Sequence, residues 1–129
     1  MKLEITPEEA VERINTVFSH AWMVRTFLKH APEFEDEAEL LAIPRSIFDC
    51  IRAVESAYVA GDTKRYLKRV KDKLRRLKEV SEDLDEELPD ISNHTNFQQA
   101  ALSLRTCVRE IEGILKAVDE GKIRTDETS

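Results

Sequence analysis

Apolar residues recur every three or four positions through most of the chain, which is the period of amphipathic α-helices. The pattern divides into four stretches, separated by proline, glycine or short polar segments. Each stretch covers about 25 residues, or roughly 37 Å at the 1.5 Å rise per residue of an α-helix. The pattern therefore predicts four helices of similar length, each with one apolar stripe.

The first predicted helix has recognisable signals at both ends. Thr6 is placed to cap its N-terminus, Pro7 suits the first helical position, and Glu9 completes a capping box. Pro32 is expected to end it. Its inward stripe comprises Val11, Ile14, Val17, Phe18, Ala21, Trp22, Arg25 and Leu28.

The second predicted helix starts in the acidic segment 33–39 and runs to about Ala60. Its stripe comprises Leu40, Ile43, Ile47, Cys50, Ile51, Val54 and Tyr58. Pro44 lies inside this pattern. Because proline removes a helical hydrogen bond, we expect a kink near Pro44, or a short helix followed by a longer one.

Gly61 is expected to stop the second helix, and Asp62 to cap the third. The third helix should run to Leu88 and stop at Pro89. Its stripe comprises Leu67, Val70, Leu74, Leu77, Ser81, Leu84 and Leu88. Residues 89–95 then form the one polar loop of any length that the pattern predicts.

The fourth predicted helix opens near Thr95 or Asn96 and ends at Gly121. It buries Phe97, Ala101, Leu104, Val108, Ile111, Leu115 and Val118. A chain of 129 residues is one domain, which we place at 1–121, with 122–129 as a frayed tail. Short connections make neighbouring helices antiparallel, so the prediction is an all-α, up-down-up-down four-helix bundle.

The charges are distributed unevenly along the third helix. Nine of the chain's 20 basic residues and a single acid fall within residues 64–78, although the net charge of the chain is −6. The candidate anion-binding residues of this basic block are Lys64, Arg65, Lys68, Arg69, Lys71, Arg75 and Arg76. The block can bind an external anion, remain solvated, or pair with acids inside the bundle, and we expect the pairing.

Antiparallel packing predicts the acids that would pair with the basic block. They are Glu4, Glu8, Glu9 and Glu12 on the first helix and Glu110, Glu112, Asp119 and Glu120 on the fourth. The opposite pole collects eleven acids from residues 33–39 and 82–90, for which Lys29 and Lys78 are the nearest expected cations. Arg25, on the core face, should reach Glu37 or Glu39, with an anion-binding role as the alternative.

A second stripe on the first helix gives the candidate interface. His20, Met23, Phe27 and His30 are spaced three, four and three residues apart and lie roughly opposite the core stripe. Coverage by Leu3 and Ile5 would explain them as a local packing feature. The functional interpretation is a self-association or partner surface.

Arg13 and His20 are separated by six residues, a spacing that resembles the short Arg-x(4–6)-His signature of HEPN ribonucleases. That family consists of small helical bundles. The resemblance implies that Arg and His, paired across a dimer, polarise the 2′-OH and the scissile phosphate of RNA by general acid–base action. A HEPN-like ribonuclease is therefore one alternative function.

No Cys/His cluster has zinc spacing, and no histidine follows a glutamate by three positions as di-iron bundles require. We therefore expect no metal and no cofactor. The absence of an apolar leader or a membrane-length segment, together with the unpaired Cys50 and Cys107, predicts a cytoplasmic protein.

These patterns favour a non-enzymatic bundle that acts through protein–protein contact, as a homodimer or with a protein partner and without contact to a membrane. Its first candidate interface is the His20–His30 stripe. The alternative from another class is nucleic-acid binding by the basic block, which would give a strong salt dependence of affinity.

Overall fold

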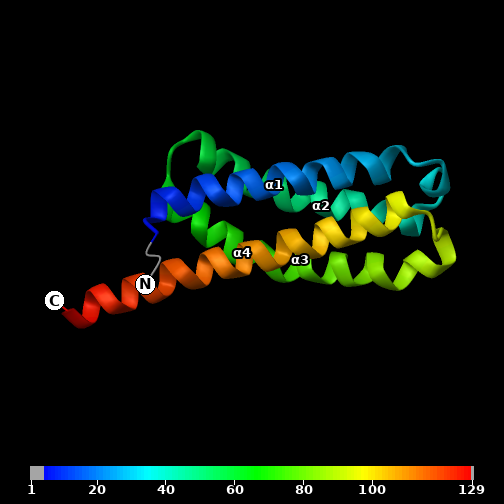
Figure 1. The fold of residues 1–129 in the computed structure, drawn as a ribbon. Coiled ribbons are helices and arrows are strands. Elements are labelled where there is room, and N and C mark those ends of the chain that lie inside the picture. Colours follow the sequence, from blue (N-terminus) through cyan, green and yellow to red (C-terminus); the bar gives the residue numbers. More distant parts are fainter. Residues whose placement is uncertain (1–4, 129) are drawn as a thin grey trace.

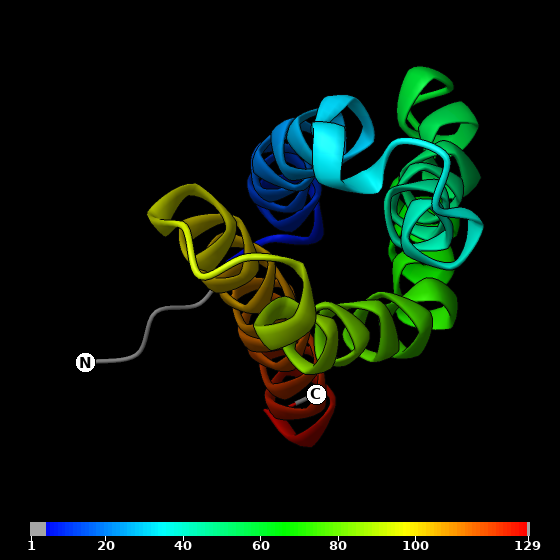
Figure 2. The same ribbon diagram turned by 90° about the vertical axis from the view of Figure 1, so that its right-hand side faces the viewer.

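A computed structural model describes residues 5–128 of the chain and the side chains of residues 5–119. Its helices are α1 (Pro7–His30), the 3-10 turn η1 (Pro32–Phe34), α2 (Ala38–Val59), α3 (Thr63–Ile91) and α4 (Thr95–Thr128) (Figure 1). Successive α-helices run in opposite directions. Viewed from the end, they surround the core in chain order, so that α1 lies between α2 and α4 (Figure 2). The predicted antiparallel four-helix bundle is confirmed.

The helix starts follow the predicted capping chemistry. The Thr6 hydroxyl accepts a hydrogen bond from the Glu9 backbone N–H at 3.0 Å, and an Asp62 carboxylate oxygen accepts one from the Arg65 N–H at 3.1 Å. These bonds satisfy N–H groups that have no partner within the helix. Gly61, with φ of 68°, turns the chain between α2 and α3 in a conformation that suits glycine.

Two prolines do not end helices where the pattern predicted. α2 runs unbroken through Pro44, so a break into two helices there is wrong, while a kink stays a prediction. Pro89 lies inside α3, which continues to Ile91 because Leu88 and Ile91 both pack against the core. The loop before α4 is consequently limited to residues 92–94.

α4 also extends further than predicted. Its helix continues through Gly121 to Thr128, so the expected end at Gly121 is wrong. Fraying of residues 122–129 stays a prediction, and Ser129 lies outside the described residues.

The core runs along the bundle axis and is built largely from the predicted stripes. On α1 and α3 the buried residues differ slightly from the predicted stripes. On α3, Tyr66 and Val80 are buried, while Leu67 and Leu74 are only half-buried. On α1, Val24 is buried, while three residues of the predicted stripe, Val17, Trp22 and Arg25, are half-buried. These three therefore lie at the margins of the core. Within the described residues, no helix is long and apolar enough to cross a membrane.

Candidate interaction surfaces

The basic block on α3 is partly neutralised by acids of α3 and α4. Lys71 Nζ lies 3.0 Å from Asp119 Oδ1, and Lys78 Nζ lies 3.7 Å from Glu112 Oε2. Lys68 pairs with Asp72 at 3.4 Å, and Arg75 with Glu79 at 4.0 Å. All eight side chains are well exposed, and such pairs contribute at most about 1 kcal/mol each. They nevertheless lower the positive potential of this surface.

Two arginines of the block turn toward α2. Arg69 donates hydrogen bonds to the Ala53 carbonyl at 3.0 Å and to the Ser56 hydroxyl at 3.2 Å. Arg76 donates one to the Ser46 hydroxyl at 2.9 Å. These acceptors are neutral, so they orient the guanidinium groups and leave their charge uncompensated.

The expected pairing with α1 does not occur among the described residues. Glu8 and Glu9 form no ion pair with the block, and Glu12 instead accepts hydrogen bonds from the Tyr58 hydroxyl at 3.2 Å. The reason is topological: α3 lies diagonally across the core from α1. Glu4 lies outside the described residues, as does the side chain of Glu120. Within the described part, Lys64, Arg65 and Lys73 have no ion-pair partner.

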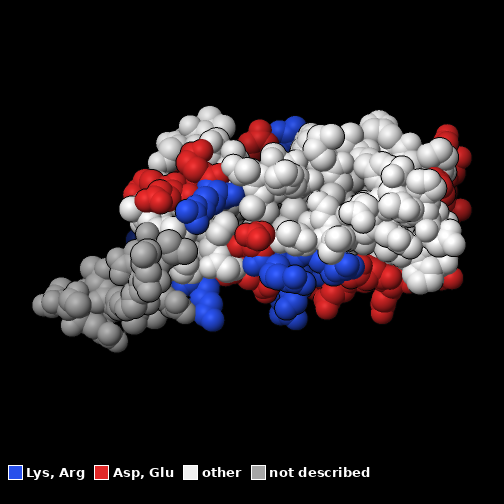
Figure 3. All heavy atoms as spheres, in the orientation of Figure 1, with Lys and Arg blue, Asp and Glu red and all other residues white. Residues whose placement is uncertain are grey.

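The acidic pole lies at the end of the bundle that holds η1, the end of α3 and the start of α4, and carboxylates lie along its edge in Figure 3. Arg105 of α4 pairs with Asp85 there. Lys78, expected to balance this pole, pairs with Glu112 instead, so that prediction is wrong. Lys29 lines a cleft between α1 and α2 and forms no ion pair with any of these acids.

The predicted stripe on α1 is only partly a free surface. His20, Met23 and His30 are exposed, with Met23 at 64%. Phe27 is half-buried and packs against Phe97 of α4, with ring centres 5.2 Å apart. The stripe is therefore the edge of a wider surface that α1 shares with α4.

That wider surface carries almost no charge. Residues 14–24 of α1 and residues 92–104 at the start of α4 contain no Asp, Glu, Lys or Arg, in a chain that is 36% charged. α1 and α4 pack side by side in opposite directions, with Phe27 against Phe97 and Val17 against Cys107. In this register the two segments lie beside each other where residues 20–24 face residues 100–104. Figure 3 shows the resulting uncharged surface over the facing halves of these helices. We call the outward side chains of these two segments, together with Phe27, the uncharged α1/α4 face.

The face has a protruding residue and a cavity at one end. Met23 on α1 and Leu102 on α4 are two of the three large apolar side chains that are exposed among the described residues. Beyond Phe27 the surface is hollowed into a cavity of about 480 Å³. Its lining residues are Thr26, Phe27, His30, Ala31, Pro32, Glu33, His94, Asn96 and Phe97.

The α4 half of this face was missed by the sequence analysis. The signal was present, since residues 92–104 belong to the chain's longest uncharged run, 91–104. Its meaning depends on the topology, which places that run beside the uncharged part of α1.

The HEPN-like pair is not assembled within one chain. Arg13 and His20 are both exposed on α1, seven residues apart, which corresponds to about 10 Å along the helix. The family resemblance pairs an Arg and a His across a dimer, which one chain does not test, so the ribonuclease alternative stays a hypothesis.

Neither cysteine is suited to nucleophilic chemistry. Cys50 and Cys107 are buried and unpaired, and burial raises the pKa of both thiols, to about 11 for Cys107. Across the described side chains, no group of three or more His, Cys, Asp or Glu residues is placed to hold a metal ion.

Arg25 does not reach Glu37 or Glu39, so that expectation is wrong. Its guanidinium carbon lies 4.5 Å from the centre of the Trp22 ring and 5.0 Å from the centre of the Phe48 ring. Cation–π contact with these two rings, one from α1 and one from α2, explains how a half-buried Arg is tolerated without a carboxylate.

Comparison of the chain with protein-family models, with curated proteins and with solved structures finds no match.

Proposed function

We propose that this protein is a non-enzymatic contact module that self-associates as a homodimer through the uncharged α1/α4 face. The observation that carries the proposal is the absence of charged residues from two adjoining helical segments in a highly charged chain. Charged residues are depleted from the cores of protein interfaces because their desolvation is costly. Each copy has a net charge of −6, so contact through a neutral face also keeps the charges of two copies apart.

The shape of the face supports a symmetric dimer. In a two-fold interface the same patch serves both copies, so a protrusion must meet a recess of the same patch. Met23 protrudes, and the cavity beyond Phe27 includes His30, seven residues or about 10 Å further along α1. A standard interface buries about 800 Å² on each partner. That is about a tenth of the 8317 Å² surface of one copy.

The contribution of Met23 can be bounded. Full burial of a methionine side chain contributes about 1.5–3 kcal/mol. With 64% of Met23 still exposed in one copy, about 1–2 kcal/mol remains for each copy, or about 2–4 kcal/mol for each dimer. This corresponds to a change of about 30- to 1,000-fold in the dissociation constant.

Sedimentation equilibrium of the parent, Met23→Glu and Val59→Glu tests the proposal. Val59 is a matched control because it is 79% exposed at the end of α2, away from the face. The parent and Val59→Glu should dimerise at tens of micromolar, and Met23→Glu should remain monomeric at the same concentration. A monomeric parent, or a dimer that Met23→Glu leaves intact, would contradict the proposal.

Nucleic-acid binding by the basic block is the second candidate. It is favoured by Lys64, Arg65 and Lys73, which form no ion pair with a described residue, and by the neutral partners of Arg69 and Arg76. It requires duplex binding whose log K falls by several units for each unit of log salt concentration. A different protein bound to the same face is the alternative to the homodimer. RNA cleavage by Arg13 and His20 would require the dimer, because the two residues would act across it. The proposed compartment is the cytoplasm, supported by two buried cysteines that remain unpaired.

A further inference from the structure

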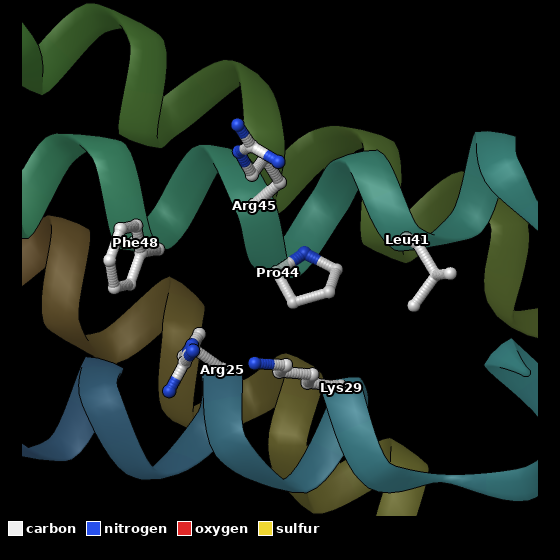
Figure 4. Close-up of a pocket in the computed structure, with 6 residues that line it drawn as sticks. All are labelled: Arg25, Lys29, Leu41, Pro44, Arg45 and Phe48. Atoms are coloured by element: carbon white, nitrogen blue, oxygen red, sulfur yellow. The ribbon is translucent and has the colours of Figure 1, made fainter.

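We propose that the cleft between α1 and α2 is a binding site for a small aromatic anion, consisting of a ring that carries a carboxylate or a phosphate. The cleft has a volume of about 350 Å³ and lies on the α2 side of α1, away from the uncharged α1/α4 face. Its lining residues are Arg25, Lys29, Leu41, Pro44, Arg45 and Phe48 (Figure 4). The inference is independent of self-association.

The polar part of the cleft is entirely cationic. Three of its six lining residues are basic and none is acidic. Arg25 and Lys29, one helical turn apart on α1, both extend into the gap between the helices, while Arg45 points away from α1 (Figure 4). Arg45 lies 4.0 Å from Asp49, whereas neither Arg25 nor Lys29 forms an ion pair with a described residue. Two adjacent like charges repel each other, and a bound anion would relieve that repulsion.

Arg25 is held in a geometry that suits anion binding. Its guanidinium carbon lies 4.5 Å from the centre of the Trp22 ring and 5.0 Å from the centre of the Phe48 ring. Because the two ring centres are themselves only 5.8 Å apart, the rings hold the group beside them and do not enclose it. Its N–H groups have no hydrogen-bond acceptor among the described residues. An arginine that is held against aromatic rings while its N–H groups stay free can bind carboxylate or phosphate with two parallel hydrogen bonds.

A second arginine near the same rings provides an internal comparison. Arg52 lies 5.1 Å from the centre of the Phe48 ring, but its Nη1 is 2.8 Å from Glu55 Oε2. Its charge is therefore already met by a neighbour on α2, unlike the charge of Arg25.

The apolar wall determines the class of anion. Leu41, Pro44 and Phe48 face the gap from α2, opposite the two cations of α1 (Figure 4). A cavity of about 150 Å³ is large enough for benzene. The cleft is more than twice that size, so it can take a ring together with an acid group. Inorganic phosphate would use only the cationic half, and a neutral ring only the apolar half.

Trp22 is the chain's only tryptophan, so its fluorescence reports directly on this site. Titration with phenyl phosphate and with benzoate should each be compared with inorganic phosphate and neutral benzyl alcohol. We expect a saturable change with one or both aromatic anions, at concentrations at least tenfold lower than either control compound requires. The stronger of the two identifies the preferred acid group.

Lys29→Gln should weaken this binding at least fivefold, because it removes a charge from the cleft without touching Arg25 or the two rings. Lys64→Gln is the matched control, since it removes from α3 an exposed Lys that forms no ion pair with a described residue, and it should leave binding unchanged. The proposal is overturned if neither aromatic anion gives a saturable change, if benzyl alcohol binds equally well, or if Lys29→Gln binds as the parent does. In those cases the contact of Arg25 with the Trp22 and Phe48 rings serves only to join α1 to α2.

Discussion

The contact between α1 and α4, which supports the proposed interface, should weaken at alkaline pH. Cys107 of α4 is 3% exposed, and its thiol donates a hydrogen bond to the Val17 carbonyl of α1 at 3.6 Å. Burial raises the pKa of this thiol to about 11 from the ordinary value of 9.0. Raising the pH therefore creates a charged thiolate in this apolar position.

The sign and size of the effect follow from proton linkage. Between about pH 9 and about pH 11 the unfolded chain has lost the thiol proton, whereas the folded chain retains it. The contribution of this thiol to the free energy of unfolding is therefore complete below about pH 9 and declines above it. The loss attributable to Cys107 should reach about 1.4 kcal/mol at pH 10 and tend to about 2.7 kcal/mol above pH 11, at 1.36 kcal/mol per unit of pKa.

Urea unfolding of the parent and of Cys107→Ala, from pH 8 to pH 10, isolates this term. Cys107→Ala lowers the free energy of unfolding by a constant amount through lost packing, but it cannot lose a thiol proton. Tyr66 and Cys50, whose pKa values are also raised by burial, contribute equally to both proteins. The gap between the two stabilities should narrow by about 1.4 kcal/mol by pH 10. A gap that stays constant would refute the reasoning.

Two further substitutions test the packing and the capping. The Tyr66 hydroxyl is buried without a hydrogen-bond partner among the described residues. Tyr66→Phe should therefore raise the free energy of unfolding, measured with urea, by about 1 kcal/mol. A clear decrease would show that the hydroxyl has a hydrogen-bond partner. Asp62→Ala should lower the free energy of unfolding by about 1 kcal/mol, because α3 loses its N-terminal cap. Asp62→Asn keeps a capping oxygen and should lower it much less. Equal losses for the two variants would argue against the capping role.

The parts of the fold that local chemistry determines could be predicted from the sequence. Thr6 and Asp62 cap helices because their side-chain oxygens reach the N–H groups three residues ahead, whatever the rest of the chain does. Pro89 could not be placed in this way. Its helix-ending tendency is overcome by Leu88 and Ile91, which pack against a core that only the tertiary structure defines.

The candidate sites depend more strongly on tertiary structure. The prediction that acids of the fourth helix pair with the basic block is confirmed by Lys71 and Asp119, which lie 48 residues apart in the sequence. The expected partners among the described residues of the first helix were wrong, because pairing depends on which helices adjoin. The same applies to Arg25, for which an acid at the same pole was expected and Phe48 of α2 was found. His20 and Met23 were proposed from helical periodicity alone. The face to which they belong became visible only when α4 was placed beside α1.

The most direct test of the central claim is a dilution series of ¹H–¹⁵N correlation spectra of the parent protein. If two copies meet through the uncharged α1/α4 face, the signals that shift with concentration will cluster in residues 14–24 and 92–104 and at Phe27. The signals of α2 and of the outer side of α3 will stay fixed. Shifts confined to residues 64–78, or spectra that do not change with concentration, would contradict the account.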